Sequence, residues 1–222
     1  MIELTKTEVF GWDAAIRGMR NPMNSWDRSD SEWDFVEDPS IINPNDSVQF
    51  VLGPNDEDLM RRLCKGGPVH AKFRRMITVY VDINAPLYWW KEFDTYKVGT
   101  VANSCSTMHK IHSKEFVLAD FSWERLDIAS CQMLEMIIDF LNTNRQLFLD
   151  TKDKQYWHNM IQILPTSYNQ KRTVELNYEV LNNIYHSRLG HKLDEWHKVC
   201  EWIENLPYSW IITGKENEDG KT

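Results

Sequence analysis

The chain has 222 residues, of which 42% are hydrophobic and 26% charged, and its net charge is −8 at neutral pH. These proportions are ordinary for a globular protein and exclude a disordered, collagen-like or disulfide-scaffold chain. The acidic balance excludes the strongly basic surface of a nucleic-acid-binding protein. The four cysteines form no CxxC pair, no apolar run is long enough for a membrane span, and the first residues lack a secretory leader. We therefore expect a cytoplasmic protein with reduced thiols that binds neither membranes nor nucleic acid.

The first part of the chain mixes strand and helix signals around a long polar stretch. Residues 21–47 are rich in Asn, Asp, Ser and Pro, which is typical of a long functional or mobile loop. In chain order, the pattern predicts a strand over Ile2–Phe10, a helix over Gly11–Arg20, this loop, a helix from Gly53 to Cys64, a strand over Lys72–Ile83 and a helix that starts at Asn84.

From Trp123 onward the pattern is helical. Apolar residues recur at spacings of three and four and predict one buried helix face, made of Ile128, Cys131, Leu134, Ile138 and Leu141. Further helices are predicted over Asp150–Ile163, Thr173–Arg188 and Leu193–Leu206. We expect a single α+β domain over residues 1–213, with a helix-rich second half packed on a mixed or antiparallel sheet. The polar tail 214–222 is expected to fray.

Few local motifs carry chemistry by themselves. The histidine pair His109 and His112 fits no closed zinc pattern, so no metal site is predicted. The Ser104-Cys105-Ser106 cluster has the composition of a turn and lacks a nucleophile signature. A group of basic residues is compatible with a phosphate site or with a solvated strand end, and its members are Lys72, Arg74, Arg75, Lys97 and Lys110.

The order of several polar residues along the chain is more informative. His70 precedes the predicted strand, the strand runs into Ala85-Pro86, and Asn103 and Ser106 follow the next helix. Leu164-Pro165 then precedes a helix that contains Asn177, Asn183 and Arg188. This succession resembles the flavin-dependent thymidylate synthase (ThyX) family and extends from Trp12 to Trp202.

The chain departs from the family pattern where the family places arginines. Residues around Tyr96-Lys97-Val98 stand in place of its Arg-His-Arg triplet. Ile161 and Glu179 stand in place of two later arginines. In the family these arginines hold the flavin pyrophosphate and the phosphate of dUMP, for which charged bidentate donors are best suited.

The resemblance implies an α+β homotetramer that binds FAD at subunit interfaces. Such a protein methylates dUMP, or a related pyrimidine nucleotide, with methylenetetrahydrofolate and NADPH as co-substrates. The roles it implies are Arg188 as the catalytic residue against the uracil ring, Asn177, Asn183 and Lys97 on the flavin, His70 beside the flavin or folate, and Asn103 and Ser106 on the nucleotide.

One geometric expectation accompanies these roles. Eleven residues separate Asn177 from Arg188, which is about three turns of an uninterrupted helix and about 16 Å. The two would share one face, with Leu181 and Ile184 between them, and a flavin could lie along it. The missing arginines leave two alternatives open, namely a flavoprotein with a different pyrimidine substrate and a non-catalytic oligomeric homologue that has lost its cofactor.

Overall fold

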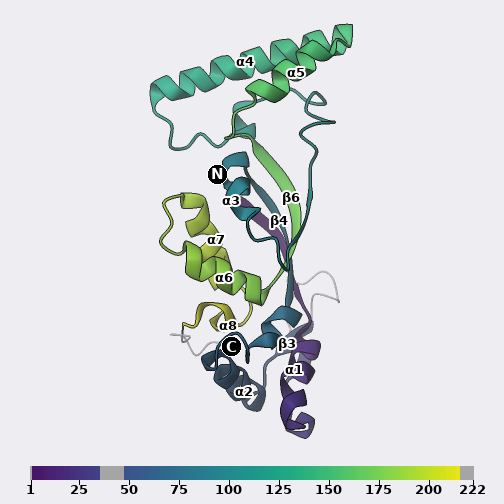
Figure 1. Cartoon of the computed structure of the whole chain (residues 1–222), viewed down its shortest axis with the longest axis vertical. Helices are drawn as coiled ribbons and strands as arrows, with labels where there is room; N and C mark the ends of the chain where they lie inside the picture. The colour runs from purple at the N-terminus through teal and green to yellow at the C-terminus, as the bar shows by residue number, and fades with distance from the viewer. Residues whose placement is uncertain (1, 36–47, 216–222) are drawn as a thin grey trace. The chain divides into compact units, whose positions relative to one another are not determined.

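The computed structural model describes residues 2–35 and 48–215, which divide into two compact units (Figure 1). The first unit consists of Met1–Thr7, Tyr80–Glu175 and His191–Val199, and the second of Glu8–Val79, Leu176–Gly190 and Cys200–Thr222. The strands are β1 (Glu3–Phe10), β2 (Glu32–Phe35), β3 (Val48–Val51), β4 (Thr78–Pro86), β5 (Val101–Ser104) and β6 (Asn169–Asn177). The α-helices are α1 (Trp12–Arg20), α2 (Pro54–Lys65), α3 (Leu87–Phe93), α4 (Ile128–Thr151), α5 (Lys154–Ile163), α6 (Tyr178–Arg188), α7 (Asp194–Glu204) and α8 (Trp210–Thr213).

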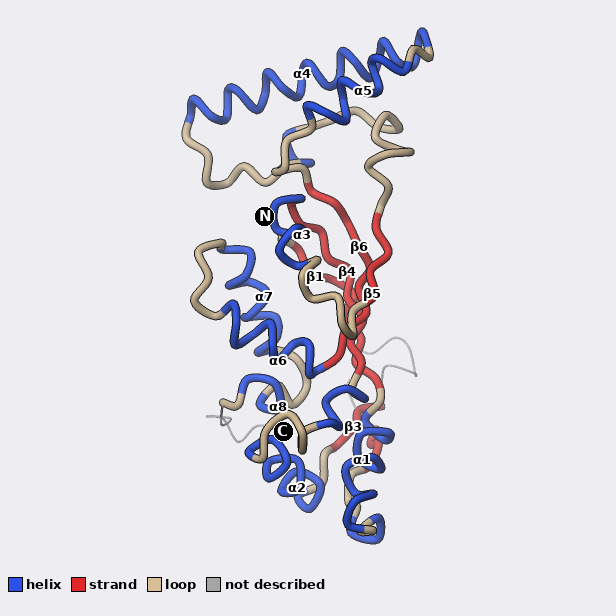
Figure 2. Tube along the Cα trace, in the orientation of Figure 1, coloured by secondary structure: helices blue, strands red, loops and turns tan. Residues whose placement is uncertain are grey.

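The main sheet has four strands in the order β1-β4-β6-β5 (Figure 2). β5 is an edge strand and pairs antiparallel with β6, so that Val101 lies opposite Glu175 and Ser104 opposite Arg172. β2 and β3 form a separate antiparallel pair. The sheet register places the residues that follow β5 beside the beginning of β6.

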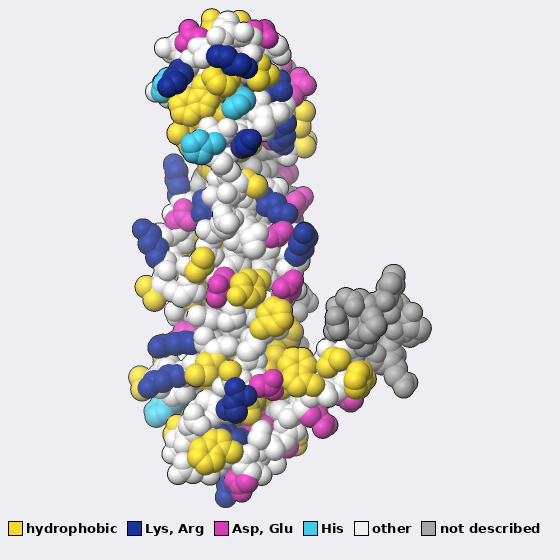
Figure 3. Space-filling model, turned by 90° about the vertical axis from the view of Figure 1, so that its right-hand side faces the viewer, with side chains coloured by type: hydrophobic (Ala, Val, Ile, Leu, Met, Phe, Trp, Pro, Cys, Tyr) yellow, Lys and Arg dark blue, Asp and Glu magenta, His cyan; other side chains and the backbone are white. Residues whose placement is uncertain are grey.

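The first unit contains two apolar clusters. Trp89 and Trp90 of α3 are fully buried, and their rings contact each other with centroids 4.9 Å apart. α4 and α5 lie side by side and cover a second cluster, whose buried members are Ile111, Phe116, Phe121, Leu134, Ile138, Leu141 and Met160. Figure 3 shows apolar side chains beside histidines and basic side chains on the surface of the part that carries these two helices.

The second unit is organised around Trp12. Its ring stacks on Phe50 at a centroid distance of 5.2 Å and meets the edges of Tyr178 and Tyr208. Residue contacts join α6 to α8 and α1 to α2 within this unit. Aromatic rings of this size bury much apolar area per residue, which accounts for several of the chain's aromatic residues.

Several predicted elements are confirmed. β1, α1, α2 and α7 occupy the expected segments within a few residues. The expected α+β class is also found, with the antiparallel pair β5–β6 in its main sheet. In the described residues, no helix is both long and apolar enough to cross a membrane.

The starts of one predicted strand and one predicted helix were wrong. The segment Lys72–Met76 is a 3₁₀ helix (η4), and the strand begins only at Thr78. The segment that was predicted as a helix from Thr173 is strand β6 up to Asn177. In β6, buried Gln170, Val174 and Leu176 alternate with more exposed neighbours, which is the period of a strand with one buried face.

Three further expectations need correction. Ile128 is 81% exposed, because it is the first residue of α4 and lies beyond the cluster that buries Leu134, Ile138 and Leu141. The helix predicted from Asp150 is interrupted, since α4 ends at Thr151 and α5 starts at Lys154. The predicted loop 21–47 contains the 3₁₀ helices η1 (Asn21–Met23) and η2 (Trp26–Arg28) and strand β2. Residues 36–47, like 216–222 of the predicted tail, lie outside the described residues.

Candidate functional site

A polar pocket of about 230 Å³ lies in the first unit. Its wall is formed by the residues after β5, by Lys114 and the short 3₁₀ helix η5 (Leu118–Asp120), by the beginning of β6 with the residue before it, and by Asn84 of β4. The side chains that matter for its chemistry are Ser106, Lys114, Asp120, Tyr168 and Lys171.

The β5–β6 ladder positions Ser106 in this pocket. Beyond the last paired residue of β5, the Cys105 N–H donates to the Lys171 carbonyl oxygen at 2.9 Å. The Gln170 side-chain amide donates to the Cys105 carbonyl oxygen at 2.8 Å. The Ser106 hydroxyl oxygen accepts from the His109 N–H at 2.9 Å, so its own proton is still available to donate to a ligand.

Both lysines of the pocket have acidic partners. Lys114 donates to the carboxylate of Asp120, and this hydrogen bond raises the pKa of Lys114. Lys171 lies 2.9 Å from a carboxylate oxygen of Asp82, and this contact raises the pKa of Lys171. Hydrogen bonds from Thr173 and Lys171 lower the pKa of Asp82. Both ammonium groups therefore stay charged at neutral pH and keep further N–H groups for a ligand.

Tyr168 adds a neutral donor to the pocket wall. Burial, reinforced by the negative charge of Asp120, raises the pKa of its phenol above the ordinary value, so the hydroxyl proton is retained at neutral pH. Ammonium, hydroxyl and amide groups together suit an anionic or strongly polar group. Because small-molecule sites usually measure about 300–1,000 Å³, this pocket can hold only part of a nucleotide or cofactor.

The residues predicted in the first unit are all exposed. Ser106 lines the pocket, whereas Asn103 lies on β5 opposite Thr173 and Lys97 lies in the loop between α3 and β5. Among these three predicted residues, the structure brings only Ser106 into the pocket.

The other predicted residues lie in the second unit. Asn177 is the N-cap of α6, and its side-chain oxygen accepts the N–H groups of Glu179 and Val180, each at 3.1 Å. Asn183 is exposed on α6, and Arg188 is half-buried at the end of this helix. His70 is exposed in the turn after α2.

The prediction that a flavin lies along the side of α6 that carries Leu181 and Ile184 is wrong for the single chain. Asn177 has extended backbone angles, so the helical rotation begins only at Tyr178. Leu181 and Ile184, which were expected to lie under the flavin, are 0% and 1% exposed and belong to the core. A flavin would have to contact α6 through exposed side chains such as Asn183.

Part of the basic cluster has a structural role. Arg74 is buried and forms an ion pair with Glu179, with 3.7 Å between nitrogen and oxygen. Glu179, which stands where the family has an arginine, therefore compensates a buried cation of its own unit. Lys72, Arg75, Lys97 and Lys110 are exposed and do not line the pocket.

Sequence reasoning missed Lys114, Asp120, Tyr168 and Lys171. Only the alternation of Gln170, Val174 and Leu176 could have indicated that Lys171 lies on a strand. Among the residues described by the structure, no group of three or more His, Cys, Asp and Glu side chains is arranged to hold a metal ion.

Comparison with known proteins identifies the fold. Two crystal structures of the flavin-dependent thymidylate synthase ThyX from Helicobacter pylori, both with FAD and dUMP, are similar to the chain, each with 16% sequence identity and a TM-score of 0.65. The similarity covers 95% and 96% of this chain and 97% of each of those chains. No protein-family profile and no curated protein sequence matches. The chain thus has the ThyX fold over nearly its whole length, and at this identity the likeness concerns the fold alone.

Proposed function

We propose that the chain is a divergent ThyX-type protein that methylates dUMP to dTMP with FAD, methylenetetrahydrofolate and NADPH. The observation that carries this proposal is the fold, which matches the FAD- and dUMP-bound Helicobacter pylori enzyme over nearly all of both chains. The order of His70, Asn103, Ser106, Asn177, Asn183 and Arg188 along the chain adds independent support.

In this proposal the polar pocket of the first unit receives part of the nucleotide. Lys114 and Lys171 hold its phosphate as charged donors, and Ser106 and Tyr168 donate neutral hydrogen bonds. These lysines would replace the arginines that the chain lacks. Arg188 polarises the uracil ring, and Asn103 contacts the nucleotide from the edge strand.

The residues assigned to FAD fit a group held between copies of the chain better than a group enclosed by one copy. His70, Lys97 and Asn183 are exposed, and the side-chain oxygen of Asn177 is already bound in the N-cap, so only its amide nitrogen can contact the cofactor. When bound, FAD would supply the reducing equivalents for the methylation. The chain's residues would bind and orient both ligands and exclude water.

A homotetramer is part of the proposal, and α4 supports it. This helix is apolar on two sides, one buried in the first unit's core and one exposed. The exposed side carries Met133, Met136, Phe140 and Leu147, whose spacings of three, four and seven place them in one stripe. A contiguous apolar stripe of this kind is typical of a protein interface.

One observation favours a non-catalytic homologue as the second candidate. The two pocket lysines already have carboxylate partners, and Arg74 is paired with Glu179. These pairs would compete with phosphate groups for the same cations. Such a protein would keep the fold and the oligomer but bind no cofactor.

The visible spectrum of the gently purified protein separates the two candidates. Added FAD should remain bound through gel filtration, and its absorption band should shift when dUMP is added. Arg188→Ala should abolish turnover while FAD stays bound. A bound flavin whose band does not respond to dUMP would indicate another substrate. If no flavin binds, the proposal of a flavin-dependent enzyme is refuted and the non-catalytic homologue is favoured.

Variants of the pocket test the nucleotide site. Lys114→Gln and Lys171→Gln should each weaken dUMP binding about tenfold, because each removes one charged hydrogen bond. Lys110→Gln is the matched control, since this exposed lysine does not line the pocket. If all three variants bind dUMP equally, the nucleotide does not occupy this pocket.

A further inference from the structure

The second unit contains a larger pocket that the proposed function does not use. Its volume is about 650 Å³, which is within the range of small-molecule sites. Its wall is formed by the end of α1, by the 3₁₀ helices η1 and η2 with the two residues between them, and by α2. Three arginines line it, namely Arg20, Arg28 and Arg62, and Met23 and Leu59 add apolar surface.

Arg20 is the buried member of this set and is held in a fixed position. Only 3% of the residue is exposed. Its Nε donates to Asp56 at 2.6 Å, and its Nη1 donates to the carbonyl and hydroxyl oxygens of Ser25 at 3.2 and 3.4 Å. The guanidinium plane is therefore fixed by partners on two sides.

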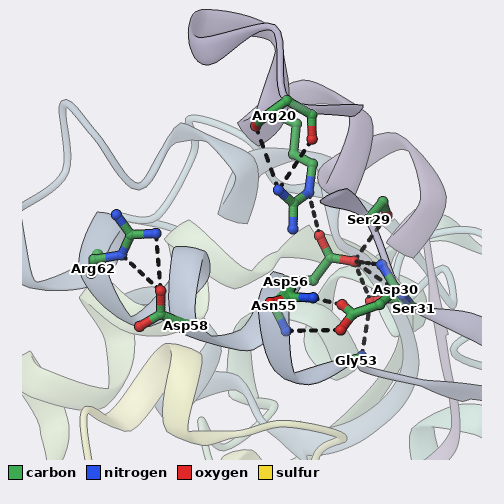
Figure 4. A network of polar contacts seen from close by, with 10 residues as sticks. Arg20, Ser29, Asp30, Ser31, Gly53, Asn55, Asp56, Asp58 and Arg62 are labelled. Carbon is green, nitrogen blue, oxygen red and sulfur yellow. Dashed lines mark hydrogen bonds and ion pairs between the residues drawn. The ribbon is translucent and has the colours of Figure 1, made fainter. Parts of the chain in front are cut away.

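The third nitrogen of Arg20 has no such partner. Among the described residues, none accepts a hydrogen bond from the buried Nη2 atom. Figure 4 shows dashed lines from two nitrogens of this guanidinium and none from the third. A buried, charged donor without an acceptor is costly, and in proteins such donors usually have a partner. A ligand in the pocket that Arg20 lines would provide this acceptor.

Asp56 does not provide it, since this carboxylate accepts from the guanidinium through Nε and not through Nη2. One oxygen accepts Arg20 Nε, and the other accepts the hydroxyls of Ser29 and Ser31 and the N–H groups of Asp30 and Ser31. The first turn of α2 is also satisfied, since the Asp30 carboxylate accepts the N–H groups of Asn55 and Asp56. The site thus depends on arginine side chains and not on a helix N-terminus.

The outer cations favour a phosphate over a carboxylate. Arg28 and Arg62 lie on the exposed part of the wall, together with the acids Asp27 and Asp58. Arg62 is paired with Asp58 at 2.9 Å on the surface, where such a pair is weak and can rearrange. A phosphate monoester has three terminal oxygens, so three arginines can each donate to one, whereas a carboxylate has only two oxygens.

We propose that this pocket binds a small phosphate monoester, with Arg20 Nη2 as the buried donor and Arg28 and Arg62 as the outer donors. Met23 and Leu59 would contact the organic group of the ester. This site belongs to the second unit alone and does not depend on the ThyX-type activity.

Isothermal titration of the full chain with phenyl phosphate, inorganic phosphate and benzoate tests the proposal. We expect phenyl phosphate to bind with a Kd below about 1 mM, inorganic phosphate more weakly, and benzoate not measurably. No binding of phenyl phosphate would overturn the proposal. Equal binding of benzoate would overturn the assignment of a phosphate.

Matched variants locate the binding. Arg62→Gln and Arg28→Gln should each weaken phenyl phosphate binding about tenfold, because each removes a charged hydrogen bond. Arg61→Gln is the control, since Arg61 forms the same kind of pair with Glu57 on the same helix but does not line the pocket. Equal affinities of the Arg61, Arg62 and Arg28 variants would contradict the proposal.

Two further variants keep the outcome unambiguous. Arg20→Lys can still pair with Asp56 but lacks Nη2, so a folded Arg20→Lys protein should lose phenyl phosphate binding. If this variant does not fold, the Arg28 and Arg62 variants still decide. Lys114→Gln alters only the pocket of the first unit and should leave phenyl phosphate binding unchanged; a loss of this binding would assign the ester to that pocket and overturn the proposal.

Discussion

The Asp56→Asn substitution tests how strongly the second unit depends on its buried ion pair. Asp56 is 0% exposed and accepts five hydrogen bonds from described residues, one of them from the buried guanidinium of Arg20. Breaking a buried pair by neutralising one partner leaves an uncompensated charge and typically costs about 3–5 kcal/mol. We expect a loss of this size in the free energy of unfolding, which is a large share of the stability of a typical domain.

The assay is urea unfolding at pH 7, followed by tryptophan fluorescence and by hydrogen exchange of the α1 and α2 amides. Because Asp56 belongs to the second unit, the loss should appear in the transition that exposes these helices. The control is Asp58→Asn, which removes an exposed pair with Arg62 two residues further along the same helix. Such exposed helical pairs contribute only about 0.3–0.5 kcal/mol.

The pH dependence has a definite sign. Burial opposes the ionisation of Asp56, but hydrogen bonds from Ser31, Arg20, Asp30 and Ser29 outweigh it and hold the pKa below the ordinary value. The folded state therefore binds fewer protons at this site than the unfolded state. The stabilisation is present above about pH 4 and is lost as the pH falls through the lowered pKa. The difference between wild type and Asp56→Asn should shrink over this range, and a difference at pH 7 no larger than that of Asp58→Asn would refute the reasoning.

Three further predictions follow from single contacts. In urea unfolding, Asn177→Ala should lower the free energy of unfolding by about 1 kcal/mol, because it removes the N-cap of α6. The control Asn183→Ala, on the exposed side of the same helix, should change this free energy by less than about 0.5 kcal/mol. Phe140→Glu should reduce the mass of the oligomer in light scattering, since it introduces a charge into the exposed stripe of α4; an unchanged mass would exclude this stripe as an interface. Burial, with the nearby Glu204 charge, raises the pKa of the Cys200 thiol to about 11. Iodoacetamide at pH 8 should therefore alkylate the exposed Cys105 and spare the buried Cys200, which peptide mapping would measure.

Local patterns predicted the elements whose signals are local. α2 begins at Gly53-Pro54 and has acids in its first turn and bases in its last, which are sequence signals that need no tertiary contact. β4 was placed too early, because the β-rich composition of Lys72–Ile83 did not reveal that Lys72–Met76 forms a 3₁₀ helix. Composition gives the element type more reliably than its first residue.

The candidate site depended on information that the sequence pattern does not contain. Lys171 is near Asp82 because β4 and β6 are neighbours in the sheet, and Lys114 is near Asp120 through the turn at η5. Neither pairing follows from periodicity, since strand order and register are set by the whole core. Ser106 was predicted from its place in the family-like succession, while the lysines beside it correspond to no motif.

Asn177 illustrates how one residue decides between two structures. The segment Asn169–Asn177 pairs with β5, and the side-chain oxygen of Asn177 then satisfies the first N–H groups of α6. An asparagine followed by an acid in the first turn is the expected start of a helix, so the boundary was readable at this point. Leu181 and Ile184 of this helix are buried in the core, so only the opposite side of α6 can meet a ligand or another copy of the chain. If the proposed flavin binds, Asn183 and not the Leu181–Ile184 face must contact it, so Asn183→Ala should weaken FAD retention while leaving the fold intact.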